Sequence, residues 1–237
     1  RCLDSIPENA DIQIIIVDDN SQFINFNNFP GKKRKHVFCY FTKKSKGAGF
    51  ARNIGLTHAT GKWIIFADSD DFFHDNFLSF LEQHESSDMD LIYFGMNSLF
   101  SDTLEPANRA SNFVELLDKA SNKNHEAREI IKYKFLYPSC KMIKKDLIDK
   151  NSLKFDEVPA SNDTMFGVRV EYSAQNISYN PDIVYCLTFR ENSLVTSYKY
   201  EYLRSRLEVS FRLYQFLKKI GKHRYAQSPI NHWLQIR

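Results

Sequence analysis

Two short apolar runs, each ended by acidic residues, constrain this chain most. Residues 12–17 form an almost unbroken run of β-branched side chains, followed at once by Asp18 and Asp19. Residues 63–67 form a second apolar run, which is followed by Asp, Ser, Asp and Asp at 68–71. An apolar run without polar alternation is typical of a strand that is buried on both faces of a parallel sheet. The two runs therefore predict two buried strands whose carboxyl ends carry carboxylates.

The segments around these runs predict an α/β fold. Residues 37–41 and 90–95 indicate further strands, and the apolar spacing supports one helix near 50–56 and another that opens at Asp75. Strands that alternate with helices form a largely parallel sheet covered by helices. Ligands of such sheets bind beyond the carboxyl ends of the strands, where we expect both acidic groups to lie.

The second half of the chain has another pattern and no internal repeat. Residues 97–112 are polar and predict a loop, and Ser161 or Asn162 is expected to cap the helix that begins at Asp163. The remaining expected elements are one or two helices over 113–135, a short strand over 140–143, a helix over 163–170, a strand over 179–189 and a helix over 200–220.

Composition narrows the function classes. A net charge of +3 is too small to argue for a nucleic-acid partner. The four cysteines are widely spaced and form no zinc-binding pattern. The sequence contains no apolar run long enough to cross a bilayer.

Asp68 and Asp70 form a candidate metal site. Two carboxylates close together suit Mn²⁺ or Mg²⁺, which complete their shell with water and substrate phosphates. A strand-to-helix turn, in which aspartate is a favoured cap, is the plain alternative. A calcium loop is excluded, because Phe72 and Phe73 stand where it needs Asp or Asn and then Gly. A phosphohydrolase using Asp68 and Asp70 stays open, although Phe72 replaces its usual Thr or Val.

Several ordered segments of the chain form one pattern: Arg1–Ile6, Ile14–Ser21, Lys46–Gly55, Gly61–Asp71, Tyr137–Leu147, Leu153–Asp156, Ser161–Phe166 and Phe189–Ser193. Together they resemble family 2 glycosyltransferases of the GT-A fold. The resemblance spans roughly residues 1–195 and is similar to bacterial surface-polysaccharide members. It implies a Rossmann-like, mostly parallel central sheet flanked by helices, with a helical C-terminal extension.

The resemblance implies inverting transfer of a sugar from a nucleoside diphosphate donor, of the UDP-sugar class, to a hydroxyl of a glycan or lipid-linked glycan. The resemblance also implies roles for individual residues of this sequence. Asp163 would be the general base, and Asp70 together with Asp68 would hold Mn²⁺ or Mg²⁺. The residues implied in donor binding are Asp18 at the turn, Asp19 at the base, Arg52 near the diphosphate, Asp68 at the ribose and Arg190 in a phosphate-side loop.

Two departures from the family pattern stand out. Asn162 occupies a position where the family usually has Glu, while the adjacent Asp163 is kept. The family's first strand, which helps to bind the nucleotide, would precede Arg1. A non-catalytic protein that binds nucleotide sugars with the same fold therefore remains a second alternative.

The C-terminal end carries a concentration of positive charge. Residues 200–224 contain seven Lys or Arg and two Glu, a net charge of +5. Such a helix is compatible with an anionic membrane surface at the inner face of the cell membrane, where a lipid-linked acceptor would lie. A helix packed on the domain with a basic outer face is the alternative. We expect a cytoplasmic protein with a GT-A domain over 1–199 and a basic helical extension over 200–237.

Overall fold

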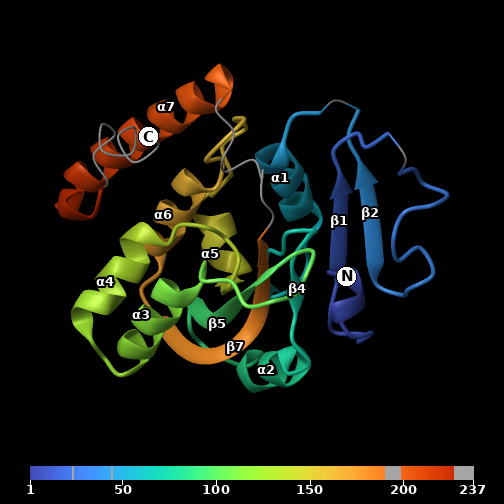
Figure 1. Cartoon of the computed structure of the whole chain (residues 1–237), viewed down its shortest axis with the longest axis horizontal. Coiled ribbons are helices and arrows are strands. Elements are labelled where there is room, and N and C mark those ends of the chain that lie inside the picture. The colour runs from blue at the N-terminus through green and yellow to red at the C-terminus, as the bar shows by residue number, and fades with distance from the viewer. Residues whose placement is uncertain (23, 44, 190–198, 227–237) are drawn as a thin grey trace.

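The computed structural model describes residues 1–22, 24–43, 45–189 and 199–226, and contains two sheets and seven α-helices in that part of the chain (Figure 1). The strands are β1 (Ile14–Asp18), β2 (Val37–Phe41), β3 (Trp63–Ile64), β4 (Phe72–Phe73), β5 (Leu91–Phe100), β6 (Lys141–Lys144) and β7 (Ile177–Phe189). The helices are α1 (Ala48–His58), α2 (Phe77–His84), α3 (Ser111–Ser121), α4 (His125–Lys134), α5 (Lys145–Lys150), α6 (Thr164–Ser173) and α7 (Tyr200–Lys219).

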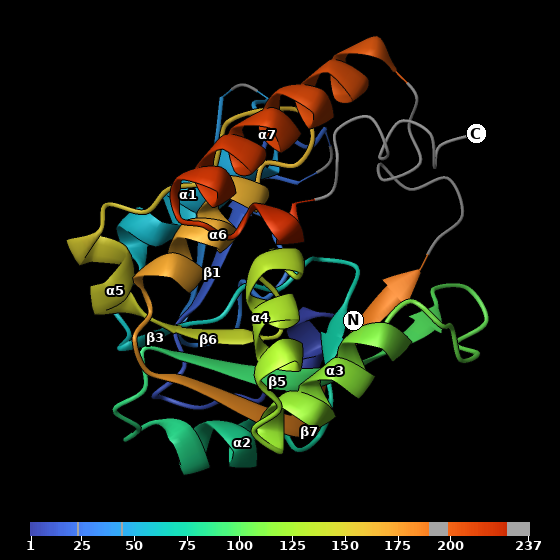
Figure 2. The same ribbon diagram turned by 90° about the vertical axis from the view of Figure 1, so that its left-hand side faces the viewer.

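The strands form a two-stranded and a five-stranded sheet. β1 and β2 pair in parallel, and the larger sheet has the order β3-β6-β5-β7-β4 (Figure 2). The long β5–β7 pair is parallel, whereas the three other pairs of the larger sheet are antiparallel and involve only two or three residues each. The α/β expectation is confirmed, and the larger sheet is mixed because its short strands return against their neighbours.

Several boundaries differ from the expected ones. The strand expected over 63–67 keeps ladder pairing only at Trp63 and Ile64. The loop expected over 97–112 is wrong at both ends, because residues 111–112 begin α3 and residues 97–100 are strand. Those four residues extend β5, because they continue its parallel pairing with β7. The sequence analysis also missed β4 and α5, which are two and six residues long. Asp163, not Ser161 or Asn162, occupies the N-cap position of α6.

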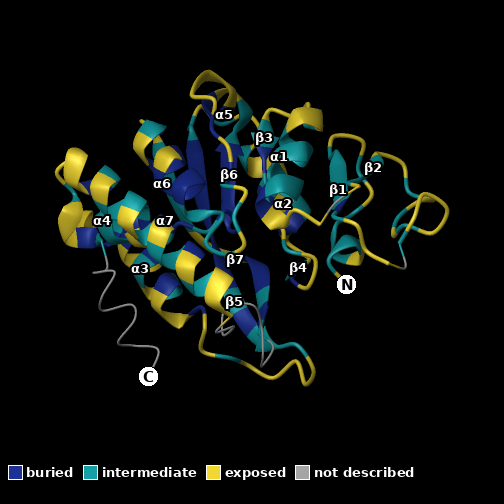
Figure 3. Cartoon of the chain, turned by 90° about the horizontal axis from the view of Figure 1, so that it is seen from above, coloured by how far each residue is buried: buried dark blue, intermediate teal, exposed yellow. Residues whose placement is uncertain are grey.

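The core lies between the larger sheet and its helices, and Figure 3 shows this buried centre surrounded by exposed loops. Residues 91–94 of β5 are completely buried. The core also contains an ion pair, since Lys141 Nζ lies 2.9 Å from Glu171 Oε1 and both side chains are almost fully buried. The Tyr93 hydroxyl donates to the same carboxylate oxygen. Burial of charge is tolerated here because the two charges are paired.

The C-terminal helix packs on the domain. Val209 and Leu217 of α7 join a second apolar cluster with Met165 and Val168 of α6. Of the basic residues expected to face outward, Arg204, Arg212 and Lys222 form ion pairs with Glu208, Asp156 and Glu129. In the part of the chain that the structure describes, no helix is long and apolar enough to cross a membrane.

Candidate active site

Asp18 and Asp19 organise the turn at the carboxyl end of β1. The carboxylate of the buried Asp18 accepts a hydrogen bond from the backbone N–H of Ser21 at 3.0 Å. Asp19 accepts from the backbone N–H of Gly47 at 2.6 Å and from the hydroxyl of Thr42. Both oxygens of Asp19 therefore contact the loop between β2 and α1, and this carboxylate joins the end of β1 to the start of α1.

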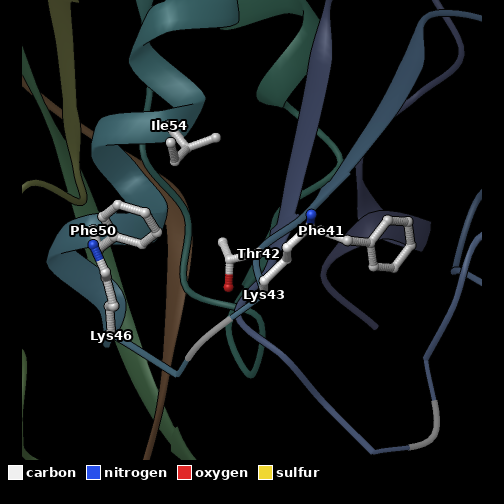
Figure 4. A pocket seen from close by; sticks show the side chains of 6 residues that line it. All are labelled: Phe41, Thr42, Lys43, Lys46, Phe50 and Ile54. Carbon is white, nitrogen blue, oxygen red and sulfur yellow. The ribbon is translucent and has the colours of Figure 1, made fainter.

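A pocket of about 430 Å³ opens at this loop (Figure 4). Its wall combines aromatic and aliphatic side chains with two lysines, and Lys46 Nζ lies 4.2 Å from the centre of the Phe50 ring. Thr42 lines the pocket and also contacts Asp19. Such a wall suits a flat, partly apolar ligand that carries negative charge. The lining residues are Phe41, Thr42, Lys43, Lys46, Phe50 and Ile54, and the sequence analysis assigned none of them a role.

Arg52 brings two distant parts of the candidate site together. Its Nη2 lies 2.6 Å from Asp68 Oδ1, and its Nη1 donates to Asn162 Oδ1 at 2.9 Å. The Arg52 side chain is 19% exposed and the Asp68 side chain 45%, so this ion pair lies at the edge of the site. The expected acidic edge of the sheet and the segment before α6 therefore meet at one guanidinium.

The acidic residues that follow β3 have different surroundings. Asp71 is buried and accepts hydrogen bonds from the Tyr185 hydroxyl and the Thr188 backbone N–H, both at 2.7 Å. Burial raises the pKa of Asp71 to about 6. The Thr188 hydroxyl donates to the backbone carbonyl of Asp70 at 2.9 Å, while Asp70 itself is exposed. Asp71 thus anchors the acidic loop on β7 and leaves Asp70 at the surface.

The carboxylates present could contribute only part of a metal shell. Among the described residues, no three His, Cys, Asp or Glu side chains gather into a group that could hold a metal ion. Asp68 is bound to Arg52, and Asp70 is exposed. Mn²⁺ or Mg²⁺ commonly binds one or two protein carboxylates and takes its other ligands from water and phosphates. Asp68 and Asp70 fit that donor set when a diphosphate supplies the other oxygens.

Asp163 stands at the start of α6, directly after Asn162. Although it occupies the N-cap position, its carboxylate makes no capping hydrogen bond. Burial raises its pKa, and the positive charge of Arg52 opposes that shift. A carboxylate that makes no capping hydrogen bond and has a raised pKa is suited to accept a proton. Arg190 lies outside the described residues, so its donor-binding role stays a prediction.

Comparison with known proteins shows the class to which this fold belongs. Residues 1–151, more than half of the chain, match the sequence profile of glycosyl transferase family 2. The chain belongs to that family, and its fold is the GT-A fold expected from the resemblance.

Named relatives agree with this membership. The poly(ribitol-phosphate) beta-N-acetylglucosaminyltransferase TarP of Staphylococcus aureus is 26% identical over 195 residues, which cover 80% of this chain and 57% of TarP. The chain thus spans little more than half the length of that relative. The structure of S. aureus TarS 1–349 in complex with UDP-GlcNAc has a TM-score of 0.69 at 21% identity, covering 97% of this chain and 69% of that one.

A more distant likeness supports the same fold. The mannosyltransferase PcManGT of Pyrobaculum calidifontis, solved in complex with GDP-Man and Mn²⁺, has a TM-score of 0.51 at 13% identity. The match covers 94% of this chain and 59% of that one.

Proposed function

We propose that this chain transfers a sugar, with inversion, from a nucleoside diphosphate sugar to a hydroxyl of a bacterial surface glycan. The observation that carries the proposal concerns the guanidinium of Arg52, which forms an ion pair with Asp68 and donates a hydrogen bond to Asn162. This contact places the acidic loop expected to bind the donor beside the segment that presents Asp163. Family membership supports the reaction class, and the UDP-GlcNAc complex of TarS supports UDP-sugar as the donor class.

In the proposed reaction, a carboxylate oxygen of Asp163 takes the proton of the acceptor hydroxyl. The hydroxyl oxygen forms a bond to the anomeric carbon while the bond from that carbon to the phosphate oxygen breaks. The electron pair of the broken bond leaves with the nucleoside diphosphate. Attack from the face opposite the leaving group inverts the anomeric centre, as in single-displacement glycosidases. The general base contributes roughly 10²- to 10⁴-fold to such a reaction.

The donor is proposed to bind at the carboxyl ends of β1 and β3. Asp19 and the adjoining pocket would hold the nucleoside, with Asp18 shaping the turn, and Asp68 would contact the ribose. Arg52 and Arg190 would lie toward the diphosphate. Mn²⁺ or Mg²⁺, held by Asp70 and Asp68, would stabilise the negative charge of the leaving diphosphate. The Mn²⁺ in the PcManGT complex supports this metal class.

The acceptor side and the location are proposed from family relatives. TarP, as its name states, transfers N-acetylglucosamine to poly(ribitol-phosphate), which supports a polymer with free hydroxyl groups as the acceptor class. We propose that the chain acts in the cytoplasm, where nucleotide sugars would be available to it. A peripheral membrane contact through residues 200–224 stays a prediction, and binding to anionic vesicles would test it.

A thermal-shift screen of nucleotide sugars with and without Mn²⁺ tests donor binding, because a bound ligand raises the melting temperature by mass action. We expect a UDP-sugar to raise it only when Mn²⁺ is present, and Asp70→Ala to abolish the rise. The phosphohydrolase alternative predicts release of phosphate from a phosphate ester without any acceptor sugar. The non-catalytic alternative predicts donor binding without transfer in the unmodified protein.

A further inference from the structure

The segment that presents Asp163 has no helix or strand of its own. Residues 153–163, here called the base loop, connect the end of α5 to the start of α6. A loop without a ladder or helical hydrogen bonds needs other contacts to hold a catalytic side chain in one place. Helices α1 and α7 supply such contacts from two sides.

Helix α1 holds the base loop through contacts with the backbone of the loop. Asn53 Nδ2 donates to the carbonyl of Phe155 at 3.0 Å, and the Phe155 N–H donates back to Asn53 Oδ1 at 2.9 Å. Gly49 lets the helix approach so closely that a Cβ there would lie 2.0 Å from the carbonyl oxygen of Asp156. This close approach, together with the Arg52 contact to Asn162, seats the loop on α1.

Helix α7 holds the same loop through an ion pair. Arg212 Nη1 lies 2.9 Å from Asp156 Oδ2, and Arg212 Nη2 donates to Asp156 Oδ1 at 3.0 Å. The Asp156 side chain is only 16% exposed. The buried Ser205, also on α7, donates to the carbonyl of Ala160 at 2.7 Å. The Arg212 guanidinium thus lies within ion-pair distance of both carboxylate oxygens, but only its contact with Oδ1 is a hydrogen bond, and the buried Oδ2 accepts none. A charge-assisted hydrogen bond to a carboxylate is stronger than a neutral one.

A backbone hydrogen bond connects Asp156 of this ion pair to the residue before the candidate base. The backbone N–H of Asp156 donates to the carbonyl of Asn162 at 3.0 Å, and Asn162 precedes Asp163. One short path therefore runs from Arg212 through Asp156 and Asn162 to Asp163. The same α7 packs on α6, the helix that Asp163 begins, through Val209 and Leu217.

We propose that Arg212 is a positioning residue: its ion pair with Asp156 holds the base loop so that Asp163 faces the donor site. This inference rests on the proposed function. Helix α7 is then a part of the catalytic apparatus rather than an appended segment. A lysine cannot reproduce this contact in full, because its ammonium is a compact point charge and does not reach both carboxylate oxygens as the planar guanidinium does. Those proposed donor-binding residues that the structure describes lie outside the base loop and α7, so we expect donor affinity to depend little on Arg212.

The test compares Arg212→Gln and Arg212→Lys with Arg204→Gln as a matched control. Arg204 lies on the same helix, and its ion pair with Glu208 is solvent-exposed and separate from the base loop. We measure kcat, the donor KM and amide hydrogen exchange of the base loop and of β5. Since a displacement of about 1 Å can cost 10²-fold in rate, we expect Arg212→Gln to lower kcat by roughly 10- to 100-fold. The donor KM should stay within about twofold of its original value.

Exchange should become faster in the base loop and stay unchanged in β5, with Arg212→Lys intermediate and Arg204→Gln like the parent. Asp156→Asn should have the effect of Arg212→Gln, and the double variant should be no worse than either. Base-loop exchange or kcat that does not differ between Arg212→Gln and Arg204→Gln would overturn the inference, as would faster exchange throughout β5. If the parent transfers no sugar while Arg212→Gln changes hydrogen exchange only in the base loop, the proposed function fails. The inference that Arg212 holds the base loop then still stands.

Discussion

Replacing Gly49 by alanine should damage both stability and catalysis, because Gly49 is where α1 meets the base loop. A Cβ at this position would lie 2.0 Å from the carbonyl oxygen of Asp156 and 3.0 Å from Cβ of Asn162. Cβ atoms essentially never approach another atom within 3.0 Å, so the helix and the loop must separate by at least about 1 Å. The displaced residues include the one that precedes Asp163.

Gly55 provides a matched control in the same helix. A Cβ at Gly55 would meet the side chains of Val17 and Ile15 at 3.7 and 3.8 Å, which are ordinary contacts. The gain in helix propensity from glycine to alanine, about 1 kcal/mol in a helix interior, applies to Gly55 more than to Gly49 in the first turn, and so favours Gly55→Ala further. Overpacking typically costs about 1–3 kcal/mol, so Gly49→Ala should be less stable than Gly55→Ala by about that amount. Asp156 is hydrogen-bonded to Asn162, which precedes Asp163, so a shift of about 1 Å that reaches Asp163 should also lower kcat by up to about 10²-fold.

Urea unfolding gives the free energy of unfolding of the two variants, and steady-state transfer kinetics give their kcat. We expect Gly55→Ala to keep the parent rate and to be at least as stable as the parent. The reasoning is refuted if Gly49→Ala matches Gly55→Ala in both free energy of unfolding and kcat.

Three other changes have expected outcomes. Arg52→Gln removes the positive charge that opposes the raised pKa of Asp163, so that pKa should rise further. In pH–rate profiles, the acidic limb of kcat should therefore move to higher pH. Arg52→Lys keeps the charge and should move this limb less. Since burial raises the pKa of Asp71 to about 6, the folded state binds a proton that the unfolded chain has released. The free energy of unfolding should fall by up to about 3 kcal/mol from pH 4 to 6, and Asp71→Asn should remove that part of the slope in urea titrations. Lys141→Met leaves the carboxylate of Glu171 buried without its cation, and should lower the free energy of unfolding by about 3–5 kcal/mol; adding Glu171→Gln should recover part of this loss.

The local signals in the sequence predicted most elements but not how they pair. Apolar runs identified β1, β2, β3, β5, β6 and β7, although the apolar side chains of β1 and β2 are half-buried or exposed rather than buried on both faces. Strand order depends on contacts between distant segments, such as the β5–β7 ladder that joins residues 91–100 to 177–189. The two-residue strand β4 was missed because so short a run has no periodicity of its own, and β3 is shorter than its apolar run because only Trp63 and Ile64 pair with β6.

The candidate site was predicted where its residues stand in motifs and was missed where they do not. Asp68 and Arg52 were identified from their motifs, and the structure brings them together. Asn53 stands in the same motif as Arg52, but nothing in its type predicts a contact with the backbone of Phe155, 102 residues away. Arg212 looked like one of several surface cations, because its partner Asp156 is revealed only by the packing of α7.

The central claim is that Asp163 is the base of a sugar transfer whose donor binds separately from it. The most direct measurement is the transfer rate of Asp163→Asn beside its affinity for the same nucleotide sugar, determined by calorimetry. Asparagine keeps the shape of the side chain but cannot take the acceptor proton. The account predicts a loss of at least about 10²-fold in kcat with donor affinity within about twofold of the parent. Transfer at the parent rate would contradict it.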